Sequence, residues 1–231
     1  MATQPAVQLA DYKQVGAYFQ QTDGPEMYEG SVVHDVFLHA NDDVLKVYYS
    51  NVSVNRVTVW KGRNDPVVQM GWQPRAIHSV RIDALRVIHA RYVSASMYVP
   101  SAIFGASPLY SPSGGTVQPR STLALMATDV ECEGIGCPAL LRLTPLQSYD
   151  LELRDVAFPD GLGGSNERLC IGESEVPATQ PPVSMALRIS NWSIGTQRVT
   201  MANFQSQRLG RLNIDVSYWG QWKIDNVPGQ V

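Results

Sequence analysis

The chain has 231 residues, a net charge of −3 and only 17% charged residues. A nucleic-acid-binding domain needs clustered Lys and Arg, so we expect no nucleic-acid partner. The sequence has no run of about 18 apolar residues, so we expect no membrane span. Residues 1–9 lack the basic start and the apolar stretch of a signal peptide.

Short runs in which apolar and polar residues alternate recur along the chain. They are rich in Val, Ile, Thr and Tyr, and each ends at Gly, Asn, Asp, Ser or Pro, which is typical of β-strands. Apolar residues rarely follow a helical spacing, and no helix of crossover length separates the runs. The expected strands are 32–38, 44–48, 54–60, 67–70, 80–88, 123–126, 151–158 and 185–189.

Two of these segments repeat each other. Residues 36–47 align with 59–70 at an offset of 23 residues, and both contain a strand, a polar turn with an Asn-Asp pair, and a second strand. Further coils are expected near 80–89, 149–158, 183–193 and 199–214. This periodicity predicts an all-β, right-handed parallel β-helix that fills one domain, 1–231, with Asn41 stacked on Asn64. An antiparallel β-sandwich is the alternative.

Two stretches, 100–119 and 159–182, interrupt the pattern with Pro, Gly and Ser. We interpret both as long loops, which on a rigid scaffold often face the substrate. Cys132 and Cys137 flank a glycine-rich turn and could pair, or the three cysteines could all be buried thiols. No His or second Cys pair completes a four-ligand metal site, so we expect no metal. Asn51 and Asn191 begin glycosylation sequons.

One group of acidic residues could carry chemistry. Asp23 precedes the pair Asp42 and Asp43 by slightly less than one coil, which would place the three on adjacent coils and on the same side. Three close carboxylates repel, and this raises the pKa of at least one. A protonated and an ionised carboxyl are the two groups that glycoside hydrolysis requires. The alternative is that these residues only cap turns, as Asp65 would one coil later.

Aromatic residues follow this acidic segment. Aromatic faces stack on the C–H faces of sugar rings, so a glucan cleft would use several of them. Trp72 and Tyr110 lie in turn and loop contexts that leave them free to face a substrate. We interpret Trp60 and Tyr48 as packing residues of the solenoid.

Eight segments resemble glycoside hydrolase family 49, which contains dextranases and isopullulanases, and the resemblance extends from about Tyr12 to Ile224. The segments are TDGPEMY (22–28), SVVHDVF (31–37), NDDVLKVYYS (41–50), NDPVVQMGW (64–72), VIHARYV (87–93), VPSAIFGASPLY (99–110), AFPDGL (157–162) and SYWGQW (217–222).

The resemblance implies a secreted, monomeric enzyme that cleaves a neutral α-glucan with inversion and without a cofactor. It implies that Asp42 is the general acid, and that Asp23 and Asp43 position and activate the water. It also implies that Trp72, Tyr110, Lys46 and Arg75 contact the sugar. All the residues to which the resemblance gives a role lie in the matching segments except Arg75, which follows one of them.

The family has a β-sandwich domain before its β-helix, so we expect this chain to be the C-terminal portion, truncated at its N-terminus. Dextran is the expected substrate, and pullulan is the alternative. A pectinase of the polygalacturonase type also sets Asp residues on a β-helix, but its Gly-His-Gly and Arg-Ile-Lys motifs are absent. A non-catalytic carbohydrate-binding solenoid is the remaining interpretation.

Overall fold

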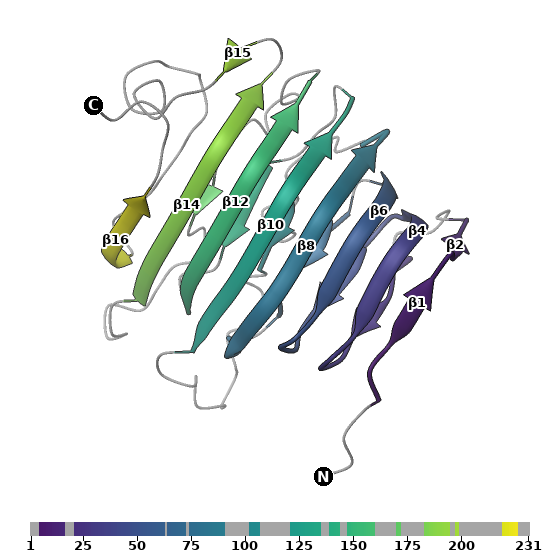
Figure 1. Cartoon of the computed structure of the whole chain (residues 1–231), viewed down its shortest axis with the longest axis horizontal. Coiled ribbons are helices and arrows are strands. Elements are labelled where there is room, and N and C mark those ends of the chain that lie inside the picture. The colour runs from purple at the N-terminus through teal and green to yellow at the C-terminus, as the bar shows by residue number, and fades with distance from the viewer. Residues whose placement is uncertain are drawn as a thin grey trace.

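The computed structural model describes residues 5–16, 21–62, 64–72, 74–90, 102–106, 121–134, 139–143, 147–159, 170–171, 183–194, 197–198 and 219–225 (Figure 1). The regular elements within these ranges are all β-strands. No helix in the described part of the chain has the length and apolar character needed to cross a membrane.

Ten strands form the larger sheet, which Figure 1 shows face-on. Its order is β1-β4-β6-β8-β10-β12-β14-β15, with β2 paired to β4 and β16 to β14. All pairs are parallel except β14 with β15. The strands are β1 (Gln8–Ala10), β2 (Lys13–Gln14), β4 (Val32–Ala40), β6 (Ser53–Lys61), β8 (Ile77–Ile88), β10 (Thr122–Cys132), β12 (Ser148–Phe158), β14 (Val183–Ile194), β15 (Gln197–Arg198) and β16 (Trp219–Asp225).

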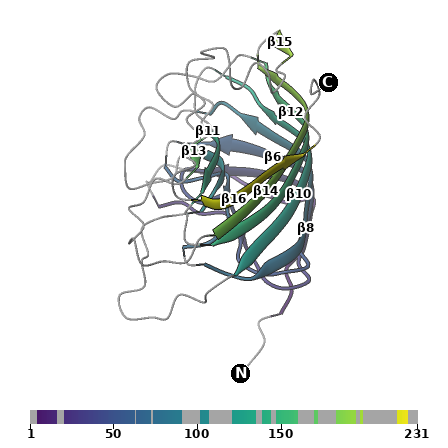
Figure 2. The ribbon, with the colours of Figure 1, turned by 90° about the vertical axis from the view of Figure 1, so that its left-hand side faces the viewer.

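Six shorter strands form the second sheet, in the order β13-β11-β9-β7-β5-β3. From β3 to β14 the chain alternates between the two sheets, so each coil adds one strand to each (Figure 2). This winding is a right-handed parallel β-helix, which confirms the predicted fold and rules out the antiparallel sandwich. The short strands are β3 (Glu26–Met27), β5 (Leu45–Val47), β7 (Val68–Gln69), β9 (Ala102–Gly105), β11 (Ala139–Leu143) and β13 (Cys170–Ile171).

Residues at one position in successive long strands adopt a left-handed backbone conformation. Their φ values lie between 50° and 56°, and such a residue bends an extended strand. In β4, the consecutive residues His34 and Asp35 therefore both face outward, and Val33 and Val36 on either side of them both point into the core. The column consists of Asp11, Asp35, Arg56, Ala84, Asp129, Asp155 and Asn191.

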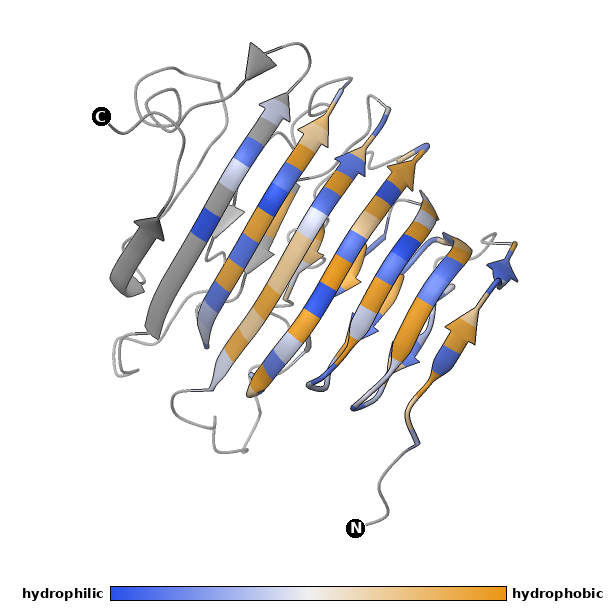
Figure 3. Cartoon of the chain, viewed as in Figure 1, coloured by the Kyte–Doolittle hydropathy of each residue, from blue (hydrophilic) through white to orange (hydrophobic). Residues whose placement is uncertain are grey.

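The core consists of apolar side chains stacked from coil to coil. Val33, Val54, Ile82, Ala127 and Leu153 are register neighbours on five successive long strands, and none is more than 1% exposed. One coil cannot bury such a row by itself, so the stack stabilises the fold only as neighbouring coils are added. Figure 3 shows the resulting alternation of apolar and polar residues along the strands.

The register corrects the predicted alignment of the first repeat. Val36 pairs with Val57, whereas Lys46 pairs with Gln69, so the second of the two turns is longer by two residues. The 23-residue offset therefore applies to the turn and to the strand that follows it, but not to the long strand before it. The backbone N–H of Asn64 donates to the carbonyl oxygen of Asn41 over 2.9 Å, which is how the two asparagines meet.

Four other expectations need correction or completion. The loop predicted at 100–119 contains β9, whose four residues are buried, and the loop at 159–182 contains β13. Trp60 is a packing residue of the solenoid on its outer face and not in the core: it is 36% exposed, and its ring lies 4.8 Å from that of His39 and 4.9 Å from that of His89 on the neighbouring coils. Cys132 is disulfide-bonded, so the interpretation that all three cysteines are buried thiols is wrong. The expected coil at 199–214 lies outside the described residues.

Candidate active site

Two turns on adjacent coils bring the three predicted aspartates together. The backbone N–H groups of Asn41 and Asp42 both donate to the carbonyl oxygen of Thr22 over 3.1 Å. The N–H of Gly24 donates to the carbonyl oxygen of Asp43 over 2.8 Å. A Cβ on Gly24 would lie 2.0 Å from a backbone oxygen of the neighbouring turn, so only glycine permits this contact. Asp23 is therefore held beside Asp42 and Asp43.

A cavity of about 610 Å³ opens at these turns. Its walls come from the segment before β3, from the two turns that precede β5 and β7, and from the ends of those short strands. The lining residues are Gln21, Asp23, Glu26, Asp42, Asp43, Lys46, Tyr48, Asn64, Asp65 and Trp72. Five carboxyl groups and one ammonium group thus face the same space.

Asp23 is the solvent-exposed member of the group. Its side chain is 43% exposed, and Oδ2 lies 2.9 Å from Nζ of Lys46 on β5. Gln14 donates to the backbone oxygen of Asp23 over 2.8 Å, which ties this turn to the first coil. An ammonium partner favours the ionised carboxylate.

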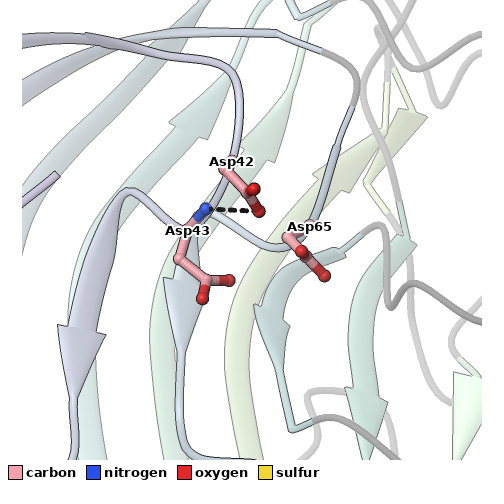
Figure 4. A group of neighbouring side chains, drawn as sticks. All are labelled: Asp42, Asp43 and Asp65. Carbon is pink, nitrogen blue, oxygen red and sulfur yellow. Dashed lines mark hydrogen bonds between the residues drawn. The ribbon is translucent and has the colours of Figure 1, made fainter. Parts of the chain in front are cut away.

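Asp42 and Asp43 are buried, with 7% and 4% of their surfaces exposed. The N–H of Asp43 donates to Oδ1 of Asp42 over 3.1 Å, which orients the Asp42 carboxyl (Figure 4). Burial raises the pKa of Asp43 to about 7, even though a hydrogen bond from Gln69 opposes the shift. The N–H of Gly71 in turn donates to the Gln69 side-chain oxygen over 3.1 Å.

A fully buried lysine joins the Asp42 turn to the next coil. Lys61 is the last residue of β6, and its ammonium donates to the backbone oxygens of Asn41, Asp42 and Asn64. The Asp42 contact is 2.6 Å long. Burial lowers the pKa of Lys61 to about 7, while the nearby aspartates oppose the shift. The ammonium therefore fixes the backbone that carries Asp42.

Asp65 lies on the same wall of the cavity, on the turn before β7. It is 4% exposed, and one carboxyl oxygen from each of Asp42, Asp43 and Asp65 lies within 4.8 Å of the others (Figure 4). Carboxyl oxygens this close could hold a hard cation. The buried ammonium of Lys61 already brings positive charge to these turns, and glycoside hydrolysis requires only carboxyl groups.

The predicted sugar-contacting residues occupy different places. Trp72 lines the cavity, and its indole N–H donates to the hydroxyl of Tyr48. Lys46 also lines it, paired with Asp23. Arg75 is not among the lining residues: its guanidinium lies 4.9 Å from the centre of the Tyr48 ring, and it donates to the Tyr48 carbonyl over 3.4 Å. Tyr110 lies outside the described residues.

Three sequence profiles of one enzyme family match separate parts of the chain. Residues 112–225 match glycosyl hydrolase family 49, residues 60–92 match the isopullulanase β-solenoid repeat, and residues 2–24 match the β-solenoid repeat of dextranase. A solved structure, Dex49A from Penicillium minioluteum, superposes on 95% of the chain with a TM-score of 0.82 and 53% identity. The chain belongs to glycosyl hydrolase family 49.

Curated family 49 relatives extend the comparison. A dextranase from Talaromyces minioluteus is 54% identical over 94% of the chain, and one from Arthrobacter globiformis is 32% identical over 93%. An isopullulanase from Aspergillus niger is 35% identical over 91%. The chain spans 35%, 36% and 39% of the lengths of these three relatives, and 38% of Dex49A.

Sequence reasoning missed several residues of this family 49 cavity. Tyr48 was expected to pack in the solenoid, and it is buried yet also lines the cavity. Asp65 was interpreted as a turn residue, although its alignment with Asp42 was the signal that could have identified it. Lys61 is not among the predicted site residues. The signal was a lysine at an inward position of an alternating strand, because Trp60 before it points outward.

Proposed function

We propose that this chain carries the catalytic cleft of an endo-hydrolase that cleaves the α-1,6 bonds of dextran with inversion. The observation that carries the proposal is the convergence of Asp23, Asp42 and Asp43 from two adjacent turns on one cavity. Glycoside hydrolysis by inversion requires one protonated carboxyl and one carboxylate, separated enough to admit a water molecule.

The surroundings of each carboxyl support a division of roles. Asp42 is the general acid of this proposal, in the role that the family resemblance gives it, and it lies buried in the cavity beside the carboxyls of Asp43 and Asp65. Asp23 enters as a carboxylate because it is ion-paired with Lys46. Asp23 and Asp43 position and activate the attacking water. Burial raises the pKa of Asp43, which favours Asp23 as the ionised base.

The charge of the cavity supports a neutral substrate. Asp23, Glu26, Asp42, Asp43 and Asp65 line it, and Lys46, the one cation among the lining residues that the structure describes, is already paired with a carboxylate. A polygalacturonate chain would bring further negative charge, and its recognition requires free Arg or Lys groups. A neutral glucan brings hydroxyl groups, which can donate hydrogen bonds to carboxylate oxygens.

Dextran is preferred because the relative at 54% identity is a dextranase. Pullulan is the second candidate, since the Aspergillus niger relative at 35% identity is an isopullulanase. Trp72, Tyr110, Lys46 and Arg75 are the proposed sugar contacts. Trp72 and Lys46 have the support of lining the cavity. Arg75 acts through Tyr48, on whose ring its guanidinium stacks.

We further propose that residues 1–231 form a single β-helix domain that acts as a monomer outside the cell. The disulfide at Cys132 supports an oxidising compartment. Both sequon asparagines are exposed, although each side-chain amide donates to a neighbouring carboxyl, Asn51 to Glu29 and Asn191 to Asp155.

The test is the release of reducing sugar from dextran, pullulan and polygalacturonate by the chain and by Asp42→Asn. We expect activity on dextran, and a loss of at least about 100-fold in Asp42→Asn, because the amide keeps the shape of the side chain but cannot donate a proton. Asp155→Asn is the matched control, since Asp155 is exposed and lies outside the cavity. Hydrolysis of polygalacturonate alone, or full activity in Asp42→Asn, would reject the proposal.

A further inference from the structure

Asp65 is a fourth aspartate of the cavity, beside Asp23, Asp42 and Asp43. Its turn stacks directly on the Asp42 turn, because Asn64 N–H donates to the Asn41 carbonyl and Leu45 N–H to the Val67 carbonyl. A turn residue that only caps backbone would not need to reach the cavity. Asp65 lines the cavity and is 4% exposed, and its carboxyl belongs to the group within 4.8 Å shown in Figure 4.

Charge repulsion forces this group to retain a proton. Among the described residues, the charged groups that face Asp65 are Asp42 and Asp43 on the preceding turn and Lys61 at the end of β6. Burial, together with a hydrogen bond to Asp42, holds the pKa of Asp65 well above its usual range, and Lys61 offsets only part of the shift. Asp65 is therefore protonated at neutral pH and donates that hydrogen bond to the Asp42 carboxyl.

We propose that Asp65 is a positioning residue of the cleft, which orients the Asp42 carboxyl and returns a proton to it after each turnover. The inference rests on the proposed function, because it assigns Asp42 the role of the acid. It adds a residue whose side chain acts through Asp42 and not on the sugar.

The proton balance of the cycle is complete. The glycosidic C–O bond breaks as its oxygen takes the proton of Asp42, while a water oxygen bonds to the anomeric carbon and one water proton passes to the Asp23 carboxylate. Asp42 then takes the proton that Asp65 holds. Bulk water carries a proton from exposed Asp23 back to Asp65, so one bond and one water molecule are consumed and no net proton is released.

Asp65→Asn is the informative substitution. Asp65 has a φ of 54°, a conformation that asparagine adopts readily, and the amide can still donate a hydrogen bond to Asp42. It can neither hold nor transfer the proton. Asp155→Asn makes the same change at another left-handed position, φ 52°, outside the cavity.

In Asp65→Asn we expect kcat on dextran to fall by about tenfold with KM nearly unchanged. The alkaline limb of the pH–rate profile should move to lower pH, because the cluster has lost one of the carboxyls whose repulsion retains its last proton. Asp155→Asn should keep the profile of the parent chain. A reduced kcat with an unmoved alkaline limb, or an unchanged kcat, would overturn the proposal.

A second readout does not depend on turnover. NMR titration of chains with 13C-labelled aspartate, with Asp65 assigned from Asp65→Asn, should show the Asp65 midpoint moving to lower pH in Asp42→Asn, because the contact with Asp42 raises the Asp65 pKa. An unmoved midpoint would overturn the inference even if dextran is hydrolysed. If the midpoint moves but the parent chain hydrolyses no glucan, the proposed function and the return step fail, and the Asp65–Asp42 contact stands.

Discussion

At the scale of single residues, the site depends on a cation that the solvent does not reach. Lys61 is fully buried, and its ammonium donates to three backbone oxygens on two turns. Burying a charge is unfavourable unless it is paired and hydrogen-bonded, and these carbonyls together with the surrounding aspartates meet that condition. The lysine thereby offsets part of the negative charge of the acidic cluster and holds the backbone of Asp42 in place.

Replacing this lysine tests its structural role. Lys61→Met keeps the length of the side chain but leaves carbonyl oxygens of the Asp42 turn without their donor. We expect the free energy of unfolding, measured by urea denaturation, to fall by about 1–3 kcal/mol. Lys13→Met is the control, because Lys13 is exposed on β2. Equal effects of the two substitutions would show that the buried ammonium does not support the turn.

At the scale of elements, the two turns need a glycine for space. A Cβ on Gly24 would lie 2.0 Å from the Val44 carbonyl oxygen, and backbone cannot move aside as a flexible side chain can. Gly30 differs, since its φ is 77° while a Cβ there would meet only a side-chain atom at 3.8 Å. The first glycine permits close approach of two coils, and the second permits a left-handed turn.

The two glycines should therefore differ on substitution. We expect Gly24→Ala to lower the unfolding free energy by about 3 kcal/mol, because it forces the Asp23 and Asp43 turns apart. Gly30→Ala should lower it by only about 1 kcal/mol, the strain of a left-handed alanine. Thermal unfolding of the two variants measures the difference. A larger loss in Gly30→Ala would contradict the close stacking of the two turns.

The sequence predicts the long strands better than the short ones. Seven or more alternating residues mark β4, β6 and β8, and the repeat of the Asn-Asp turn predicts that coils stack. β9 is only four residues long and lies between Pro- and Gly-rich stretches, so it was interpreted as loop. The long-strand register was wrong because Gly62 lies in a turn lengthened by two residues, which no local pattern reveals.

The site, like the fold, could be predicted only in part. Asp23, Asp42 and Asp43 could be grouped because their spacing is close to one coil. Lys61, Asp65 and Tyr48 could not, since their importance comes from contacts across coils that depend on side-chain direction. Alternation marks Lys61 as inward-facing and the repeat aligns Asp65 with Asp42, but neither pattern shows that the two side chains are buried, because burial is a property of the stacked coils.

At the scale of the whole molecule, the acidic cluster makes stability depend on pH. The pKa of Asp43 is about 7 in the folded chain and near 3.8 in the unfolded chain, so between these values the folded state binds more protons. Stability therefore falls as pH rises from about 4 to 7. Asp65 acts in the same direction. Lys61, whose pKa is lowered to about 7, acts in the opposite direction only above that pH.

A melting-temperature profile across this window checks the sign. We expect the parent chain to melt at lower temperature at pH 7 than at pH 5, and Asp43→Asn to reduce the difference. Asp155→Asn should retain the slope of the parent chain, because Asp155 is exposed. A melting temperature that increases with pH between 5 and 7 would show that ionisation of the cluster does not destabilise the folded chain.

The most direct test of the whole account is the anomeric configuration of the product. 1H NMR spectra recorded during the first minutes of dextran hydrolysis by this chain should show new reducing ends as β-anomers, before mutarotation equilibrates them. That result requires a water activated by one carboxylate while Asp42 protonates the opposite side of the bond. Reducing ends that first appear as α-anomers would mean a covalent intermediate, and would contradict the roles given to Asp23, Asp42 and Asp43.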